Sequence, residues 1–157
     1  MSTRANIVII LNNEDKGKTL TPDLMKLHRK RVYTEPSFLL DAKFHNTTLN
    51  EGTTGLMIYH HSDGYPTGLG NLLLTEYNSY EKALNVTLFG DCSSLHCSRF
   101  YNSWRSGEDW SFTQPTQITE TDINKIKVQE EYLYIFYKGE WYVNDGDGVK
   151  KLANVLK

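Results

Sequence analysis

The sequence has few cysteines, no large excess of charge of either sign and no long hydrophobic run. Its two cysteines, Cys92 and Cys97, are too few for the disulfide framework of a small secreted protein, so we expect reduced thiols. With 17 Lys and Arg against 19 Asp and Glu, the formal net charge is -2, which argues against a domain that binds duplex nucleic acid. No apolar run approaches the roughly 18 to 20 residues of a membrane span, and we predict no membrane partner.

The familiar catalytic motifs are missing as well. The chain contains no Gly-x-Ser-x-Gly elbow, no His-Glu-x-x-His helix, no Walker-type or Gly-x-Gly-x-x-Gly loop and no kinase motif set. Its start, Met1 to Asn6, also lacks the pattern of a signal peptide. We therefore predict a cytoplasmic protein and assign it no catalytic residue, no metal and no cofactor.

Tyrosine, by contrast, is abundant. The chain has ten tyrosines, and many of them stand near Gly, Asp or Ser rather than inside apolar runs. Aromatic side chains in polar surroundings are typical of surfaces that recognise a ligand or a partner. With 157 residues and 39% hydrophobic residues, the chain has the size and composition of a single domain that buries about two-thirds of its extended surface.

The pattern of apolar residues predicts an α+β fold with a mainly antiparallel sheet and a C-terminal hairpin, packed by several helices. Residues 7–11 form a continuous apolar run, which is typical of a central strand buried on both faces. Residues 54–61 return to strand character. Residues 132–137 and 140–143 are rich in strand-forming aromatics and are expected to pair as a hairpin.

Helices are expected at residues 22–31, 68–78, 80–89 and 148–156, from helical spacing or from a helix-start signal. A short helical turn should follow residues 119–122. Residues 32–53 fit either short strands or an irregular insertion. Residues 91–118 show no clear periodicity, and loops of this length in compact domains are frequently functional.

The densest polar and aromatic group is the segment 59–66, Tyr-His-His-Ser-Asp-Gly-Tyr-Pro, between an expected strand and an expected helix. Asp63 and Gly64 mark a tight turn, in which we expect the glycine to supply a positive φ angle. Neighbouring side chains of a strand point to opposite faces, so His60 and His61 should lie on opposite sides of the sheet. Four residues then share one side and are predicted to form one wall of a recognition surface: Tyr59, His61, Asp63 and Tyr65.

His61 and Asp63, two residues apart, support two interpretations. A carboxylate beside an imidazole raises the pKa of the imidazole and orients it, which suits a general base or a metal ligand. Together with Asp91 or Asp109, the pair would then serve a metal-assisted reaction, although a hydrolytic zinc site needs three protein ligands. In the other interpretation, Asp63 accepts hydrogen bonds from turn amides and His61 is a polar anchor.

The segment after Gly90 combines hydroxyl, basic and aromatic side chains. Asp91, Ser93 and Ser94 stand at an expected helix boundary, where side-chain oxygens and backbone amides suit a phosphate or a ribose. Residues that could pair with phosphate or stack on a base follow: Arg99, Tyr101, Trp104, Arg105 and Trp110. The alternative is a surface loop whose tryptophans cover the core.

The two cysteines flank His96 and suggest a zinc site completed by His61, but structural zinc sites usually combine two cysteine pairs, and the second pair is missing. Buried or spare thiols are the favoured interpretation. We predict the following ligand-binding residues: Arg4, Tyr59, His61, Asp63, Tyr65, Asp91, Ser93, Ser94, Arg99, Trp104 and Arg105.

Several segments together resemble a family of small proteins from bacteriophages and mobile elements. Its members typically begin with a Thr-Arg-Ser-Thr-Ile-like strand and contain Tyr-Cys-His-Trp-Asp-Gly-Tyr, a leucine-rich helix and Gly-Asp-x-Ser-Ser-Leu. The segments that carry the resemblance are Thr3-Arg4, residues 59–65, Gly90-Asp91 with Ser93-Ser94-Leu95, Gly107-Glu108-Asp109 and residues 131–143, while residues 12–53 stand outside it.

One departure concerns stacking. Where the family has Cys, His and Trp, this chain has His60, His61 and Ser62. A role in stacking on a ligand would therefore pass to Tyr65 or Trp104.

The function of that family is uncharacterised, so the resemblance implies an α+β fold and the cytoplasm of an infected bacterial host but no reaction. Small phage proteins without catalytic motifs commonly act by binding. Our first hypothesis is a counter-defence protein that sequesters a nucleotide-like signal or blocks a host defence protein. The alternatives are a metal-assisted phosphodiesterase or nuclease, and an assembly protein whose Tyr-rich surface forms a homo-oligomer.

Overall fold

The computed structural model describes residues 3–23, 46–97, 99–100 and 113–157, with only the backbone at residues 97, 99 and 100. The strands are β1 (Ala5–Ile10), β2 (Thr19–Leu20), β3 (Thr47–Thr48), β4 (Gly55–His60), β5 (Cys92–Ser94), β6 (Arg99–Phe100), β7 (Thr116–Ile118), β8 (Tyr132–Tyr137), β9 (Glu140–Asn144) and β10 (Val149–Lys151). The α-helices among these residues are α1 (Asn71–Glu76), α2 (Tyr80–Leu88) and α3 (Leu152–Val155).

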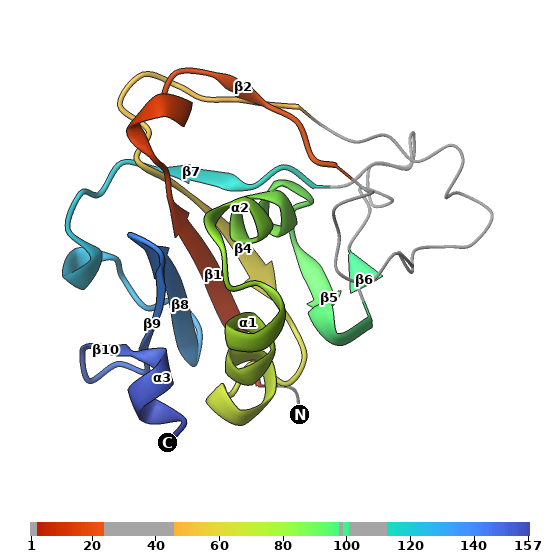
Figure 1. Ribbon diagram of the computed structural model, residues 1–157, viewed down its shortest axis with the longest axis vertical. Coiled ribbons are helices and arrows are strands. Elements are labelled where there is room, and N and C mark those ends of the chain that lie inside the picture. The colour runs from red at the N-terminus through yellow and green to blue at the C-terminus, as the bar shows by residue number, and fades with distance from the viewer. Residues whose placement is uncertain (1–2, 24–45, 98, 101–112) are drawn as a thin grey trace.

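An eight-stranded sheet organises the fold, with β1 at its centre. The strand order is β10-β9-β8-β1-β4-β5-β6, with β7 paired to β4, and β2 and β3 form a separate two-stranded sheet (Figure 1). β1 runs parallel to β8 and antiparallel to β4, with Ala5 opposite both Tyr132 and His60. The other pairings among the described strands of the sheet are antiparallel except β4 with β5, so the predicted α+β fold with a mainly antiparallel sheet is confirmed.

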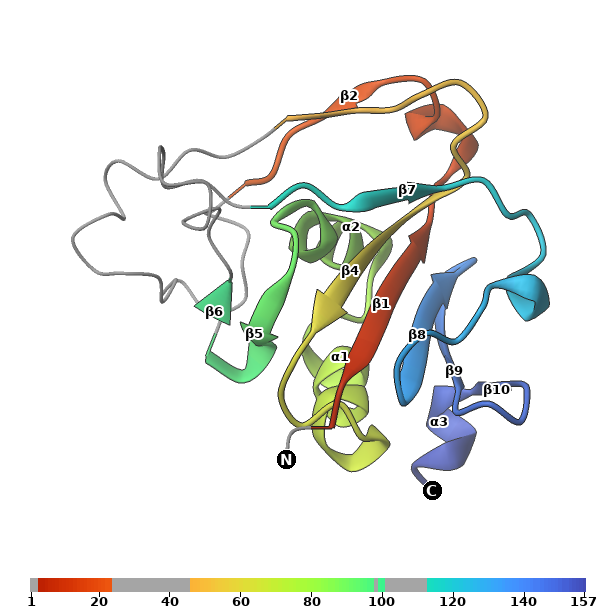
Figure 2. The ribbon, with the colours of Figure 1, turned by 180° about the vertical axis from the view of Figure 1, so that it is seen from behind.

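The sheet is covered on both faces, which explains the continuous apolar run of β1. The two opposite views show that α1 and α2 cover one face of the sheet (Figures 1 and 2). Alternate residues of β1, including Ile7 and Ile9, belong to a large core together with residues of these helices. Val8 points the other way and joins a smaller core with Ile126 and Ile135. Ile7, Val8 and Ile9 are therefore fully buried, as expected of a central strand.

The predicted C-terminal hairpin is confirmed in β8 and β9. Lys138 and Gly139 connect the strands with φ angles of 49° and 82°, the left-handed conformation that two-residue hairpin turns require. Trp141 packs edge-on against Phe136, with ring centroids 5.1 Å apart. Its indole nitrogen also donates a hydrogen bond to the carbonyl of Tyr77 at 2.8 Å, which joins the hairpin to the end of α1.

The prediction of a single C-terminal helix over residues 148–156 is wrong in its first half. Val149–Lys151 forms the strand β10, and only Leu152–Val155 is helical. Val149 packs against the smaller core, whereas Leu152 is buried in the large core on the other face. The spacing of these residues fits a helix, but pairing with β9 sends them to opposite faces of the sheet.

Other predicted elements fall partly outside the described residues. The helices at 68–78 and 80–89 are confirmed as α1 and α2, α1 being preceded by a π-helical turn, Pro66–Gly70. Asp122 caps a 3₁₀ turn, Ile123–Lys125, as expected. The helix predicted at 22–31 lies outside the described residues beyond Asp23, as does the insertion at 32–53 before Asn46.

Candidate functional site

The segment singled out in the sequence lies where β4 ends and the chain turns toward α1 (Figure 2). Its backbone continues to follow β5 beyond the last residue of β4. The amide of His61 donates to the carbonyl of Cys92 at 3.1 Å, and the amide of Ser62 donates to the carbonyl of Ser93 at 2.9 Å. Strand-like alternation of side chains therefore extends to His61.

The two histidines lie in opposite environments, as the alternation predicted. His60 is fully buried in the interior, where its Nε2 accepts a hydrogen bond from the backbone amide of Leu95 at 3.1 Å. His61 is half-buried, and its Nδ1 lies 2.8 Å from the hydroxyl of Tyr59 in a hydrogen bond. The Tyr59 and His61 rings are 5.9 Å apart at an interplanar angle of 56°, so they form one fixed pair.

Asp63 and Tyr65 form a second pair on the loop that follows. The Tyr65 hydroxyl donates a long hydrogen bond of 3.4 Å to Asp63 Oδ1, and Tyr65 is 40% exposed. Asp63 itself has a φ angle of 56°, and Gly64 is not among the residues with positive φ. The expectation that glycine supplies the positive φ here is therefore wrong, because aspartate tolerates the left-handed conformation and takes this position.

Gly64 is required for a different reason, which is its close packing against the N-terminal strand. A Cβ atom at Gly64 would lie 2.8 Å from the carbonyl oxygen of Thr3 and 3.0 Å from Cβ of Ala5. The amide of Gly64 donates to the same Thr3 oxygen, and its carbonyl accepts a 2.6 Å hydrogen bond from the buried hydroxyl of Tyr134. At Gly68, a Cβ atom would lie 2.6 Å from the carbonyl of Asp63. The contacts of Gly64 join the loop to the residues just before β1 and to β8.

Asp91 supports the Tyr59 and His61 pair from the side. Its carboxylate accepts a 2.9 Å hydrogen bond from the backbone amide of Tyr59, and its own amide donates to the hydroxyl of Thr113 at 2.7 Å. Burial raises the pKa of this carboxyl, although the bond from Tyr59 acts in the opposite direction. Asp91 therefore positions the end of β4.

The backbone amides considered for a phosphate around Asp91 have partners within the protein. The amide of Gly90 donates to Thr87, that of Leu95 to His60 and that of His96 to the Ser94 hydroxyl. Cys92 to Ser94 form the strand β5 rather than a helix start. A ligand at this edge would therefore bind to side chains, because these backbone amides already donate within the protein.

The predicted site residues separate into three groups. Four lie at the end of β4 or on the loop that leads to α1, and are called here the loop surface: Tyr59, His61, Asp63 and Tyr65. Asp91, Ser93 and Ser94 lie on or beside β5, which pairs with β4, and the exposed Arg4 precedes β1, which also pairs with β4. The Arg99 side chain, Trp104 and Arg105 lie outside the described residues, as does Asp109.

The residues considered for a zinc site do not share one environment. Cys92 is a fully buried thiol in the large core, paired in register with His60, while His61 lies on the other side of β4. The Cys97 side chain lies outside the described residues. Within the part of the chain that the structure describes, no three His, Cys, Asp or Glu side chains are grouped closely enough to hold a metal ion.

Sequence reasoning missed Tyr134 and Gly68, which hold the loop in place. Tyr134 is one of several aromatic residues in β8, and nothing in its local sequence indicates that it bonds to Gly64, which is 70 residues away. Gly68 offered a signal, because a glycine inside an expected helix usually has a packing or functional reason.

His60 makes stability depend on pH. Burial, with smaller effects from the nearby His96 and His61 imidazoles, lowers the pKa of His60 from 6.5 to about 3. The unfolded chain therefore takes up this proton at a higher pH than the folded protein. The free energy of unfolding should be highest above pH 6.5 and should fall as the pH drops toward 3, by at most about 1.4 kcal/mol per pH unit.

Urea unfolding at a series of pH values between about 6.5 and 4.5 tests this expectation against the linkage relation. His60→Gln keeps an acceptor for Leu95 and should flatten the pH dependence, while His61→Gln should leave it steep. Asp91 contributes in the opposite direction, because its raised pKa lowers stability as the pH rises above 3.8. Subtracting the His60→Gln curve from the wild-type curve removes this contribution, which both proteins share. Equal slopes for wild type and His60→Gln would show that His60 does not cause the effect.

No helix of the described residues is long and apolar enough to cross a membrane. No family model matches the chain, and neither the curated proteins nor the solved structures compared with it include a significant match.

Proposed function

We propose that the protein is a binding protein that takes a nucleotide-like ligand at the loop surface. The observation that carries the proposal is the presence of two aromatic and polar pairs, each joined by a side-chain hydrogen bond: Tyr59 with His61 and Asp63 with Tyr65. Because the surrounding loop is held by close backbone packing, little conformational entropy remains to be lost on binding.

The chemistry of the loop surface suits the parts of a nucleotide. Tyr65 is the most exposed of the large apolar side chains of the loop and provides a ring on which a base can stack. His61 and Asp63 offer hydrogen-bonding groups for a base edge or a ribose. Arg4, exposed at the neighbouring strand, supplies positive charge for a phosphate.

The setting of this activity rests on the sequence resemblance to phage and mobile-element proteins. In that setting, a binding protein without catalytic groups would act by sequestering a nucleotide signal of the host cell. If the partner is a macromolecule instead, we propose that the same surface binds and blocks a host defence protein.

Calorimetric titration with cyclic nucleotides and ADP-ribose-type nucleotides tests the proposal. Since stacking on an aromatic side chain contributes about 1 to 3 kcal/mol per base, Tyr65→Ala should weaken binding by about 5- to 150-fold. His61→Ala should also weaken it. Tyr142→Ala is the matched control, because Tyr142 is a half-buried tyrosine on β9, away from the loop surface.

Chromatography of the nucleotide recovered after the titration separates binding from catalysis. An unchanged nucleotide agrees with the proposal, whereas a cleaved one would support the metal-assisted alternative. The proposal fails if no nucleotide binds and no host protein is retained in pull-downs, or if Tyr65→Ala and Tyr142→Ala behave alike.

A further inference from the structure

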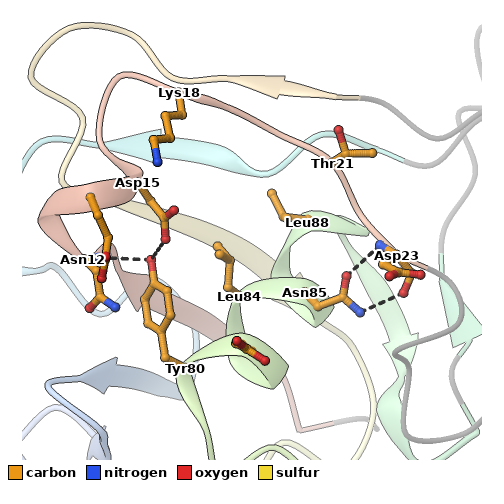
Figure 3. Close-up of a pocket in the computed structure, with 11 residues that line it drawn as sticks. Asn12, Asp15, Lys18, Thr21, Asp23, Tyr80, Leu84, Asn85 and Leu88 are labelled. Carbon is orange, nitrogen blue, oxygen red and sulfur yellow. Dashed lines mark hydrogen bonds between the residues drawn. The ribbon is translucent and has the colours of Figure 1, made fainter.

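A cavity of about 590 Å³ lies between α2 and the segment that runs from the end of β1 through β2 (Figure 3). Its volume falls within the range of small-molecule sites. It shares no residue with the loop surface. The residues that line it are Asn12, Glu14, Asp15, Lys18, Thr21, Asp23, Tyr80, Glu81, Leu84, Asn85 and Leu88.

One end of the cavity is fixed by Tyr80. The Tyr80 hydroxyl accepts a 3.0 Å hydrogen bond from the backbone amide of Asn12 and donates a 2.6 Å bond to Asp15 Oδ2. Burial, together with Asp15, raises the pKa of Tyr80, so the phenol remains a donor. The Asp15 carboxylate is thereby held in one orientation, with acceptor sites left for a second donor.

The other end is fixed by Asn85. Its side-chain oxygen accepts from the backbone amide of Asp23 at 2.7 Å, and its side-chain nitrogen donates to the carbonyl of Asp23 at 2.9 Å. Leu84 lies between the Tyr80 and Asn85 ends (Figure 3). Leu84 and Leu88 give this stretch of the cavity an apolar wall.

The Tyr80 end is acidic. Glu14 and Asp15 come from the 3₁₀ turn Asn13–Asp15, and Glu81 comes from the first turn of α2. Lys18 is the single basic residue among those that line the cavity. It is exposed, and its ammonium group points toward Asp15 (Figure 3). The same carboxylate can therefore receive an ammonium group from a ligand.

We infer that this cavity binds an alkylammonium group, with the charged nitrogen at Asp15 and its acidic neighbours and the methylene chain along Leu84 and Leu88. An ammonium ion has only donors, which matches a carboxylate whose remaining sites are acceptors. An aliphatic chain matches the apolar wall that separates the two polar ends. A free aliphatic diamine or polyamine and a lysine side chain of another polypeptide present this same group.

Calorimetric titration with 1,4-diaminobutane, spermidine and a lysine-containing peptide tests the inference. Asp15→Asn keeps an acceptor for Tyr80 but removes the charge, and should weaken binding by about 10- to 100-fold, the range expected for a hydrogen bond to a charged group. Lys18→Gln removes the competing ammonium and should strengthen binding by about fivefold. Asp147→Asn, an equal charge change at an exposed turn residue, should have no effect.

The pattern of affinities decides the outcome. Tighter binding of the free amines identifies a small-molecule site, and tighter binding of the peptide identifies a lysine side chain as the source. The inference is overturned if none of the three probes binds, if Asp147→Asn weakens binding as much as Asp15→Asn, or if Mg²⁺ or ammonium chloride displaces the diamine at equal concentration. Thermal unfolding of each variant verifies that it is folded.

Discussion

Gly90→Ala is expected to lower the free energy of unfolding by about 3 to 5 kcal/mol, more than Gly64→Ala or Gly17→Ala. Gly90 follows α2 with a φ angle of 87°, which already disfavours an L-residue. An added Cβ would also overlap the carbonyl and the side chain of Thr113. Because the overlap involves the backbone carbonyl of Thr113 as well as its hydroxyl, a change of side-chain rotamer cannot relieve it, and the backbone would have to move.

The displacement should also reach the loop surface. The Thr113 hydroxyl accepts from the amide of Asp91, and the Asp91 carboxylate accepts from the amide of Tyr59. Moving Thr113 therefore disturbs the residue that supports Tyr59. We expect any ligand affinity of the loop surface to fall together with stability in Gly90→Ala.

Urea unfolding of Gly90→Ala should be compared with Gly17→Ala as the matched control. Gly17 has a similar φ angle of 78°, but nothing lies within 4 Å of the position of its Cβ. Gly17→Ala therefore measures the conformational cost alone, about 1 to 2 kcal/mol. If both variants lose the same stability, the contact with Thr113 is not the cause.

Gly64→Ala is expected to lower the free energy of unfolding by about 2 to 4 kcal/mol, because its Cβ would meet backbone that cannot rotate away. The nearest backbone atoms are the carbonyl oxygen of Thr3 at 2.8 Å and the carbonyl carbon of Arg4 at 3.2 Å, and Cβ of Ala5 lies at 3.0 Å. Relief of this clash would separate the loop from β1. It would also lengthen the 2.6 Å hydrogen bond between Tyr134 and the Gly64 carbonyl.

Gly70→Ala provides the control for this second variant. At Gly70 the nearest atoms lie at 3.0 and 3.2 Å, but they belong to the side chains of Leu152 and Tyr134, which can adjust. Alanine also favours the helical backbone at this position, so we expect a change within about 1 kcal/mol. Urea unfolding and nucleotide titration of both variants check the prediction. Equal losses in the two variants would show that backbone packing at Gly64 is unimportant.

Local sequence predicted the regular elements whose residues have one clear periodicity. β1 followed from a continuous apolar run, and the hairpin of β8 and β9 from aromatic strands around Lys138-Gly139. The opposite environments of His60 and His61 followed from strand alternation alone. In each case the deciding interaction is between residues close in the chain, or is a burial pattern that the order of residues already contains.

The errors occurred where distant contacts compete with local spacing. Val149 and Leu152 have helical spacing, yet pairing of β10 with β9 places them on opposite faces of the sheet. In the turn, Asp63 adopts the positive φ because Gly64 is needed where β1 approaches most closely. Neither outcome follows from the residues of the turn or of the C-terminal segment alone.

The sequence by itself determined the α+β class, the central strand and the side of β4 on which His61 lies, because alternation and apolar runs are properties of neighbouring residues. Only the tertiary structure decided which groups meet. It brings Gly64 against Thr3 and Tyr134, Asp91 against Tyr59, and Asp15 against Tyr80. These partners are far apart in the chain and meet only when the sheet has assembled and α2 has packed against it, so the local sequence around each residue does not predict its partner.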